Sequence, residues 1–165
     1  MNSYQHLIGR EWHYGKQDCY GIVRDFYKDI FNIDLPNYAR PNDFWDHGLN
    51  MYIERFNKNN FKVLNCHPSE YQFGDVFLMS IKSNVANHAG VLVDKGMILH
   101  HMVNQLSTVT HYRSVYRNNT VAILRHKDVI DPLGNDVASI TDFIPDHIKR
   151  KFNENFKNSN STITG

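Results

Sequence analysis

The chain has few cysteines, no long apolar segment and almost no net charge, and each absence excludes a class of protein. Its 165 residues include two cysteines, Cys19 and Cys66, which cannot form a framework of several disulfides and indicate a reducing compartment. No apolar run approaches the ~20 residues of a membrane-spanning helix. The first residues lack the basic and apolar regions of a secretory signal peptide. With 18 Lys and Arg against 17 Asp and Glu, the charge gives no electrostatic case for nucleic acid or an anionic membrane.

The hydrophobic pattern predicts helices first and strands afterwards. Apolar residues recur at helical spacing over 19–31, with Asp18 as the predicted N-cap, and again over about 43–57. Short runs of β-branched and aliphatic residues, separated by polar turns, predict strands over 61–64, 75–81, 88–93, 97–103 and 120–126. This order indicates an α+β domain with a mostly antiparallel sheet.

The pattern changes near residue 128, so we predict a compact domain over 1–127 and an extension over 128–165. Pro132 and Gly134 interrupt regular structure at the start of the extension. Apolar residues spaced four apart predict a short amphipathic helix there: Ile144, Ile148, Phe152 and Phe156. The polar residues at the end of the chain are expected to be disordered.

Cys19 occupies the first turn of the first predicted helix. Unpaired backbone N–H groups and the positive end of the helix dipole lie there, and both favour a thiolate, the nucleophilic form of cysteine. The alternative, that Cys19 only packs in the apolar stripe of the helix, stays open from the helix alone. Cys66 is followed by a His and a Pro and is expected to pack in a loop.

The predicted hairpin after residue 88 brings two imidazoles together. A three-residue loop at 94–96 places His88 and His100 on one face, whereas a two-residue loop at 95–96 would place His101 beside His88. We favour the longer loop because it puts glycine where a positive φ is needed. One imidazole could then accept a thiol proton while the second orients it, as the acid does in a Ser-His-Asp triad.

Three motifs in combination carry a family resemblance. Residues 9–27 read GREWHYGKQDCYGIVRDFY, residues 74–76 read GDV at a strand start, and residues 88–91 read HAGV, with His100 further along. The set resembles the NlpC-type papain-like cysteine peptidases, and within them the subgroup found in tail assembly proteins of lambda-like phages. The resemblance spans about residues 7–127.

The resemblance implies a papain-like fold with Cys19 as nucleophile, His88 as general base and His100 as the orienting residue. It requires no metal and no organic cofactor, and the scattered histidines do not show zinc-ligand spacing.

Two departures leave the oxyanion donors open. Tyr20 replaces the Ser that usually follows the nucleophile, and Trp12 takes the place of an upstream Tyr, with Tyr14 as an alternative. Asn87, beside the general base, could position the base or the substrate. The backbone N–H of Cys19 is the best-founded oxyanion donor.

The resemblance further implies a thiol hydrolase that cleaves amide bonds in peptidoglycan stem peptides through an acyl-enzyme. A wall-cutting enzyme made in the host cytoplasm without a leader would be carried by the virion tail tip. We therefore expect the extension at 128–165 to dock onto another tail-tip protein, with Ile148, Phe152 and Phe156 as anchors. The alternatives are a structural tail-tip component or assembly factor, a protease that matures a tail protein, and an acyltransferase or amidase of the same superfamily.

Overall fold

A single antiparallel sheet organises the part of the chain that the computed structural model describes, residues 3–41 and 43–129. Six strands lie in the order β1-β6-β2-β3-β4-β5. They are β1 (Phe61–Val63), β2 (Val76–Met79), β3 (His88–Asp94), β4 (Met97–His100), β5 (Thr108–His111) and β6 (Thr120–His126). The α-helices in these ranges are α1 (Cys19–Phe31), α2 (Met51–Lys58) and α3 (Val115–Asn118), and the 3-10 turns are η1 (Gln5–Leu7) and η2 (Pro68–Glu70). The α+β class is thus confirmed.

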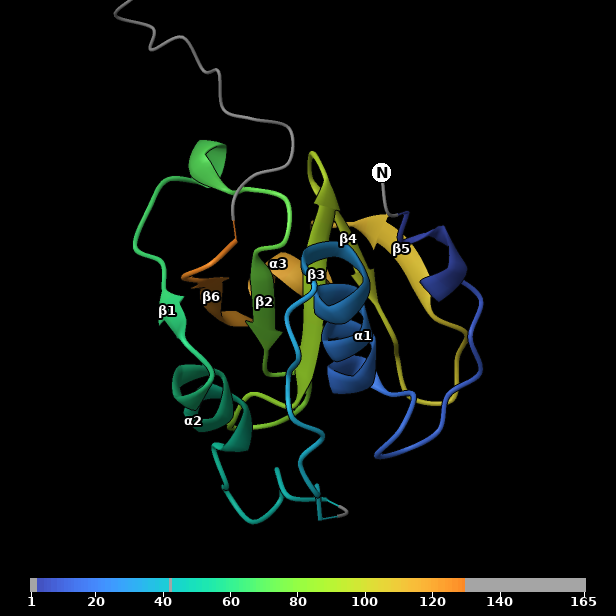
Figure 1. Ribbon diagram of the computed structural model, residues 1–165. Coiled ribbons are helices and arrows are strands. Elements are labelled where there is room, and N and C mark those ends of the chain that lie inside the picture. The colour runs from blue at the N-terminus through green and yellow to red at the C-terminus, as the bar shows by residue number, and fades with distance from the viewer. Residues whose placement is uncertain (1–2, 42, 130–165) are drawn as a thin grey trace, which may run out of the picture. The chain divides into compact units, whose positions relative to one another are not determined.

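Helix α1 packs on one face of the central strands β3 and β4 (Figure 1). It begins at Cys19 as predicted, because the Asp18 side chain caps it by accepting a hydrogen bond from the Gly21 N–H at 2.8 Å. It ends where Asn32 adopts the left-handed conformation, with φ of 55°. Its buried residues form the core against the sheet: Cys19, Tyr20, Gly21, Ile22, Val23, Phe26 and Tyr27.

The hairpin of β3 and β4 has the predicted pairing but not the predicted turn. Gly90 lies opposite His100, as expected, so the two histidines of this hairpin share one face. Asp94, however, pairs with Met97, which leaves a two-residue turn instead of a three-residue loop. An irregularity between Leu92 and Asp94 adds one residue to β3 and restores the register. The turn prediction was wrong, and the bulge explains why the faces are nevertheless correct.

Two further expectations need correction. The second helix starts at Met51 rather than near residue 43, because Asp43 and Gly48 have positive φ angles of 57° and 66°, which a helix cannot contain. Strand β5 was not predicted, because the sequence Thr-Val-Thr-His carries too few apolar residues to form a recognisable run.

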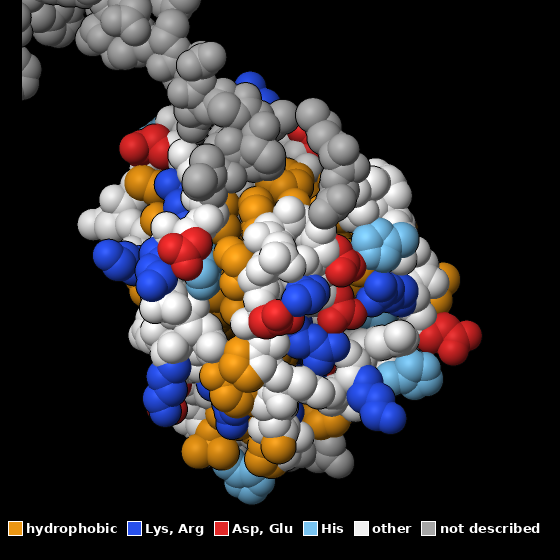
Figure 2. All heavy atoms as spheres, viewed as in Figure 1, with side chains coloured by type: hydrophobic (Ala, Val, Ile, Leu, Met, Phe, Trp, Pro, Cys, Tyr) orange, Lys and Arg blue, Asp and Glu red, His pale blue; other side chains and the backbone are white. Residues whose placement is uncertain are grey.

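The surface around α1 carries charges of both signs side by side (Figure 2). Asp25 on this helix pairs with Arg10 at 2.7 Å and with Arg24 at 2.8 Å. Among the described residues, no helix combines the length and hydrophobicity that crossing a bilayer requires. The predicted amphipathic helix at 144–156 lies outside the described residues, as does the rest of the extension beyond residue 129.

Candidate active site

A cavity of about 270 Å³ lies at the N-terminal end of α1. Its walls come from the loop before α1, the segment before α2, the start of β3 and the residues that follow β4. The lining residues are Trp12, Tyr14, Asp18, Cys19, Asp43, Trp45, Tyr52, Asn87, His88, His101 and Val103. The candidate nucleophile and general base therefore border the same space. His100 is fully buried and does not line the cavity, but it is hydrogen-bonded to His88, which does.

The Cys19 sulfur is buried in the wall of this cavity, with 8% of the residue exposed. Within the described ranges the sulfur lies 3.2 Å from the Tyr52 hydroxyl and 3.9 Å from the Asn87 carbonyl, and it also has a hydrogen bond with the Ala89 backbone. His88 is not among these partners. Burial, followed by the neighbouring Asp18 carboxylate, raises the pKa of Cys19 to about 11. At this position desolvation therefore opposes the effect of the helix N-terminus and favours the thiol.

His88, His100 and Thr110 form a hydrogen-bonded chain across three neighbouring strands. Nε2 of His88 lies 3.0 Å from Nδ1 of His100, and Nε2 of His100 lies 3.1 Å from Oγ1 of Thr110. Burial, with His100 and His101 nearby, lowers the pKa of His88 to about 3. Burial and His101 lower the pKa of His100 to about 4. Burial therefore favours the neutral form of both rings, in which His88 has one unprotonated ring nitrogen.

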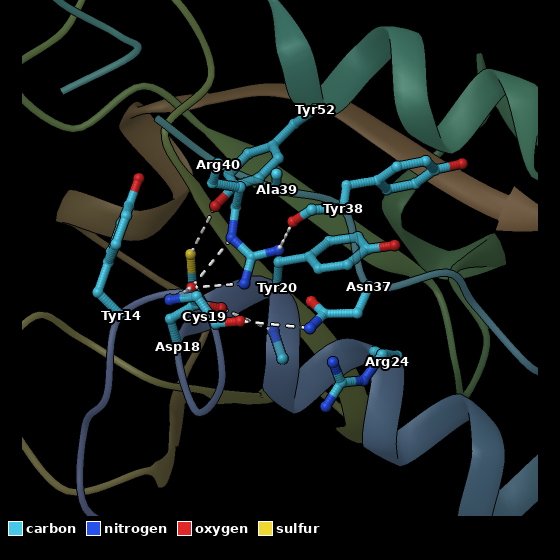
Figure 3. A network of polar contacts seen from close by, with 12 residues as sticks. Tyr14, Asp18, Cys19, Tyr20, Arg24, Asn37, Tyr38, Ala39, Arg40 and Tyr52 are labelled. Atoms are coloured by element: carbon cyan, nitrogen blue, oxygen red, sulfur yellow. Dashed lines mark hydrogen bonds and ion pairs between the residues drawn. The ribbon is translucent and has the colours of Figure 1, made fainter. Parts of the chain in front are cut away.

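A buried ion pair fixes the start of α1 (Figure 3). The Asp18 carboxylate accepts hydrogen bonds from Nε and Nη2 of Arg40 at 3.0 and 2.7 Å. It also accepts from the backbone N–H groups of Gly15 and Gly21, both at 2.8 Å. One carboxylate therefore ties the preceding loop, the helix terminus and the segment before α2 together, directly beside Cys19. Of these contacts, the sequence predicts only the capping role of Asp18.

The other predicted site residues, Trp12, Tyr14 and Asn87, also line the cavity. The polar groups of Tyr14 and Asn87 form hydrogen bonds with the protein backbone. The Tyr14 hydroxyl donates to the Pro41 carbonyl at 2.7 Å. The Asn87 amide accepts from the Ile81 N–H at 2.8 Å and donates to the Ile81 carbonyl at 2.9 Å, which shapes the loop before β3. Trp12 packs against Tyr14, with 5.9 Å between their ring centroids, and forms an aromatic wall.

Tyr52 and His101 are among the cavity residues that were not assigned to the site from the sequence. Tyr52 lies on the apolar stripe of α2 and was expected to be a core residue, yet its hydroxyl meets the sulfur. His101 follows β4 and donates through Nε2 to the Gln105 carbonyl at 2.9 Å, while its buried Nδ1 has no hydrogen-bond partner among the described residues. Tyr52 carries no local motif that would have marked it, whereas His101 was considered as the neighbour of His88 under a two-residue turn. In the described part of the chain, no cluster of His, Cys, Asp and Glu is placed to hold a metal ion.

The arrangement suits acyl transfer. A thiol and a neutral imidazole border one cavity, the imidazole is oriented from behind by a second ring, and backbone N–H groups lie at the helix terminus beside the sulfur.

Comparison with known proteins supports this chemistry at the level of a family. Residues 9–125 match the NlpC/P60 family. The chain is similar to tail tip assembly protein K of Escherichia phage lambda, with 31% identity over 143 residues, which cover 84% of this chain and 70% of that protein. It is also similar to tail tip assembly protein K of Escherichia phage N15, with 30% identity over 125 residues, or 74% of this chain and 50% of that protein.

A solved structure supports the fold. NlpC1 from Trichomonas vaginalis matches with a TM-score of 0.53 at 14% identity, over 74% of this chain and 41% of that chain.

Proposed function

The chain belongs to the NlpC/P60 family, and we propose that it is a cysteine peptidase that hydrolyses amide bonds in peptidoglycan stem peptides. The observation that carries the proposal is the shared cavity: Cys19 and His88 both line it, and His88 is hydrogen-bonded to His100 behind it. The substrate class follows from the family resemblance of the motifs around these residues.

The hydrogen-bond chain assigns the proton positions. For His88 to accept a proton at Nδ1, its Nε2 must carry hydrogen and donate to Nδ1 of His100. His100 then carries its own hydrogen on Nε2, which donates to the Thr110 hydroxyl oxygen. When His88 becomes an imidazolium, its Nε2–H keeps the same partner, so His100 both orients and stabilises the charged ring.

Catalysis proceeds in two steps. The Cys19 thiol loses its proton to His88 as the sulfur attacks the amide carbonyl, and backbone N–H groups at the start of α1 stabilise the oxyanion. The carbon–nitrogen bond breaks when His88 protonates the leaving amine, which leaves a thioester on Cys19. His88 then takes a proton from water, the hydroxide attacks the thioester, and the products are a carboxylic acid and the restored thiol.

Delivery by a phage tail is part of the proposal. The two relatives named above are tail tip assembly proteins, which supports a place in tail-tip assembly or in the finished tail. We propose that residues 128–165 dock onto another tail-tip protein. Unchanged tail incorporation after deletion of 128–165 would show this docking proposal to be wrong.

Digestion of purified peptidoglycan, followed by mass spectrometry of the fragments, tests the enzymatic function. The wild-type chain should release fragments with one new amine and one new carboxyl group, Cys19→Ala should release none, and Cys66→Ser should match the wild type. Products without a new amine and carboxyl pair would indicate an acyltransferase instead.

A second candidate function is tail-tip assembly without catalysis, which the names of the two relatives favour. Phage that carry Cys19→Ala distinguish the two. Complete tails with impaired entry through the cell wall support the peptidase, whereas normal tails and normal infection favour a cavity that is not used for catalysis. Loss of processing of a tail protein would instead indicate a maturation protease.

A further inference from the structure

Tyr52 reaches the nucleophile from a different helix. It lies in the first turn of α2, 3% of the residue is exposed, and its hydroxyl oxygen is 3.2 Å from the Cys19 sulfur (Figure 3). Its ring stacks on Tyr20 at 6.2 Å and 15° and meets the edge of Phe44 at 5.3 Å and 67°. Two aromatic neighbours therefore fix the ring, and with it the direction of the hydroxyl.

The protonation states decide which atom donates. Burial, reinforced by the adjacent sulfur, raises the pKa of Tyr52 well above its usual value of 10, so the phenol keeps its proton. Against a neutral thiol, either the oxygen or the sulfur can donate. Against a thiolate, only the Tyr52 hydroxyl can, and the bond becomes charge-assisted. The interaction thus strengthens as Cys19 loses its proton.

We propose that Tyr52 is a catalytic residue whose hydroxyl donates to the Cys19 sulfur as the thiolate forms. The cavity removes the water that would otherwise stabilise the anion, and the phenol supplies a hydrogen bond in its place. The same hydrogen bond acts to lower the pKa of Cys19 against the larger effect of burial. This inference rests on the proposed function in taking Cys19 as the nucleophile.

Tyr20 is the positioning residue for this hydroxyl. Its ring forms the platform on which Tyr52 stacks, its own hydroxyl donates to the Pro36 carbonyl at 2.7 Å, and the Arg40 guanidinium lies 5.0 Å from its ring centroid. Tyr20 stands where the family usually has Ser, and the structure gives a reason for this departure: a Ser side chain could not stack on the Tyr52 ring.

The test is the pH dependence of Cys19 ionisation, measured in a Cys66→Ser background by iodoacetamide alkylation. Tyr52→Phe keeps the packed ring and removes only the hydroxyl. We expect it to lower the thiolate fraction, and with it the alkylation rate below the thiol pKa, by about 10–100-fold. Tyr38→Phe is the matched control, because its hydroxyl bonds to Asn59 and not to the sulfur. Coincident pH profiles for Tyr52→Phe and its parent would overturn the proposal.

A second measurement keeps the test decisive if the reagent reaches the buried sulfur slowly. The ¹³C chemical shift of the Cys19 Cβ follows thiol ionisation without a reagent, and Tyr52→Phe should move its titration to higher pH. Tyr20→Leu, which removes the platform, should move it the same way by less, whereas Tyr20→Phe should leave it in place. Equal titrations for Tyr20→Leu and Tyr20→Phe would overturn the positioning role.

Neither readout needs peptidoglycan. A shifted titration in a chain that does not cleave peptidoglycan would leave the role of Tyr52 standing and refute the proposed function. Cleavage that is unaffected by Tyr52→Phe, together with an unshifted titration, would do the reverse.

Discussion

The two sides of the cavity are built by different means. On the sheet side, His88, His100 and Thr110 lie on the neighbouring strands β3, β4 and β5, and backbone pairing sets the distances between their side chains. On the helix side, Tyr52 contacts the Cys19 sulfur and Arg40 pairs with the adjacent Asp18, so side-chain contacts hold their chain segments near α1.

Because of this difference, substitutions on the two sides should affect the reaction rate and the stability of the fold to different degrees. A strand keeps its register when one side chain is shortened, so substitutions on the sheet side should change the reaction more than the fold. On the helix side the buried contact is an ion pair between Asp18 and Arg40, and removal of one charge leaves the other buried without this partner. Substitutions there should change both.

Removal of the general base should have the largest effect. His88→Ala should reduce peptidoglycan cleavage by about 10²–10⁴-fold, the usual contribution of a positioned acid–base group. His111→Ala, an exposed histidine on β5, serves as the control and should keep full activity. If His88→Ala cleaved at the wild-type rate, the sheet side would have no role in the chemistry.

Arg40→Met should destabilise the fold by about 3–5 kcal/mol, because it leaves the Asp18 carboxylate buried without its partner. Chemical denaturation measures this loss as a lower midpoint. The comparison is Arg125→Met: Arg125 pairs with buried Asp75 at 2.7 Å, but 24% of its own side chain is exposed against 1% for Arg40. Water can therefore replace Arg125 more easily, and its loss should be smaller. An equal or larger loss at Arg125 would show that the helix side is not specially dependent on its ion pair.

Acid should destabilise the sheet side. The pKa values of His88 and His100 are lowered in the fold to about 3 and about 4, from 6.5 when unfolded. Below about pH 6.5 the unfolded chain therefore binds more protons, and the free energy of unfolding falls by up to about 1.4 kcal/mol per pH unit for each histidine, down to the folded pKa values. Urea titrations at pH 7, 6 and 5 should show this slope in the wild type and a flatter one in His88→Gln/His100→Gln. The same slope in both would contradict the assignment.

Thr110→Val should have the smallest effect. It removes the acceptor of the His100 Nε2–H and should lower the free energy of unfolding by about 1 kcal/mol, with a small decrease in cleavage rate. Thr108→Val, on the same strand and without a side-chain hydrogen bond in the described structure, is the matched control. A larger loss for Thr108→Val than for Thr110→Val would place the end of the hydrogen-bond chain elsewhere.

Local signals in the sequence were sufficient for α1 and for the two histidines of the sheet side, but not for Thr110, whose strand β5 was not predicted. The capping Asp and the apolar spacing give α1 its observed bounds, and the two-residue period of a strand places His88 and His100 on one face. The turn was predicted with the wrong length, but His88 and His100 still share one face because the bulge in β3 restores the register.

The helix side could not be predicted in the same way. Tyr52 meets Cys19 across 33 positions and Arg40 meets Asp18 across 22, and no periodicity links residues so far apart through irregular segments. The direction of the Cys19 pKa shift could not be predicted from the sequence either. Burial is its largest cause, and burial is a property of the folded cavity.

Mass spectrometry of an acid-quenched reaction with peptidoglycan fragments tests the central claim most directly. If Cys19 attacks the amide and His88 assists, a protein species should appear whose mass is increased by the acyl part of the substrate. Proteolysis should map this addition to the peptide that contains Cys19. Cleavage that continues in Cys19→Ala, or an addition mapped to any other residue, would contradict the account.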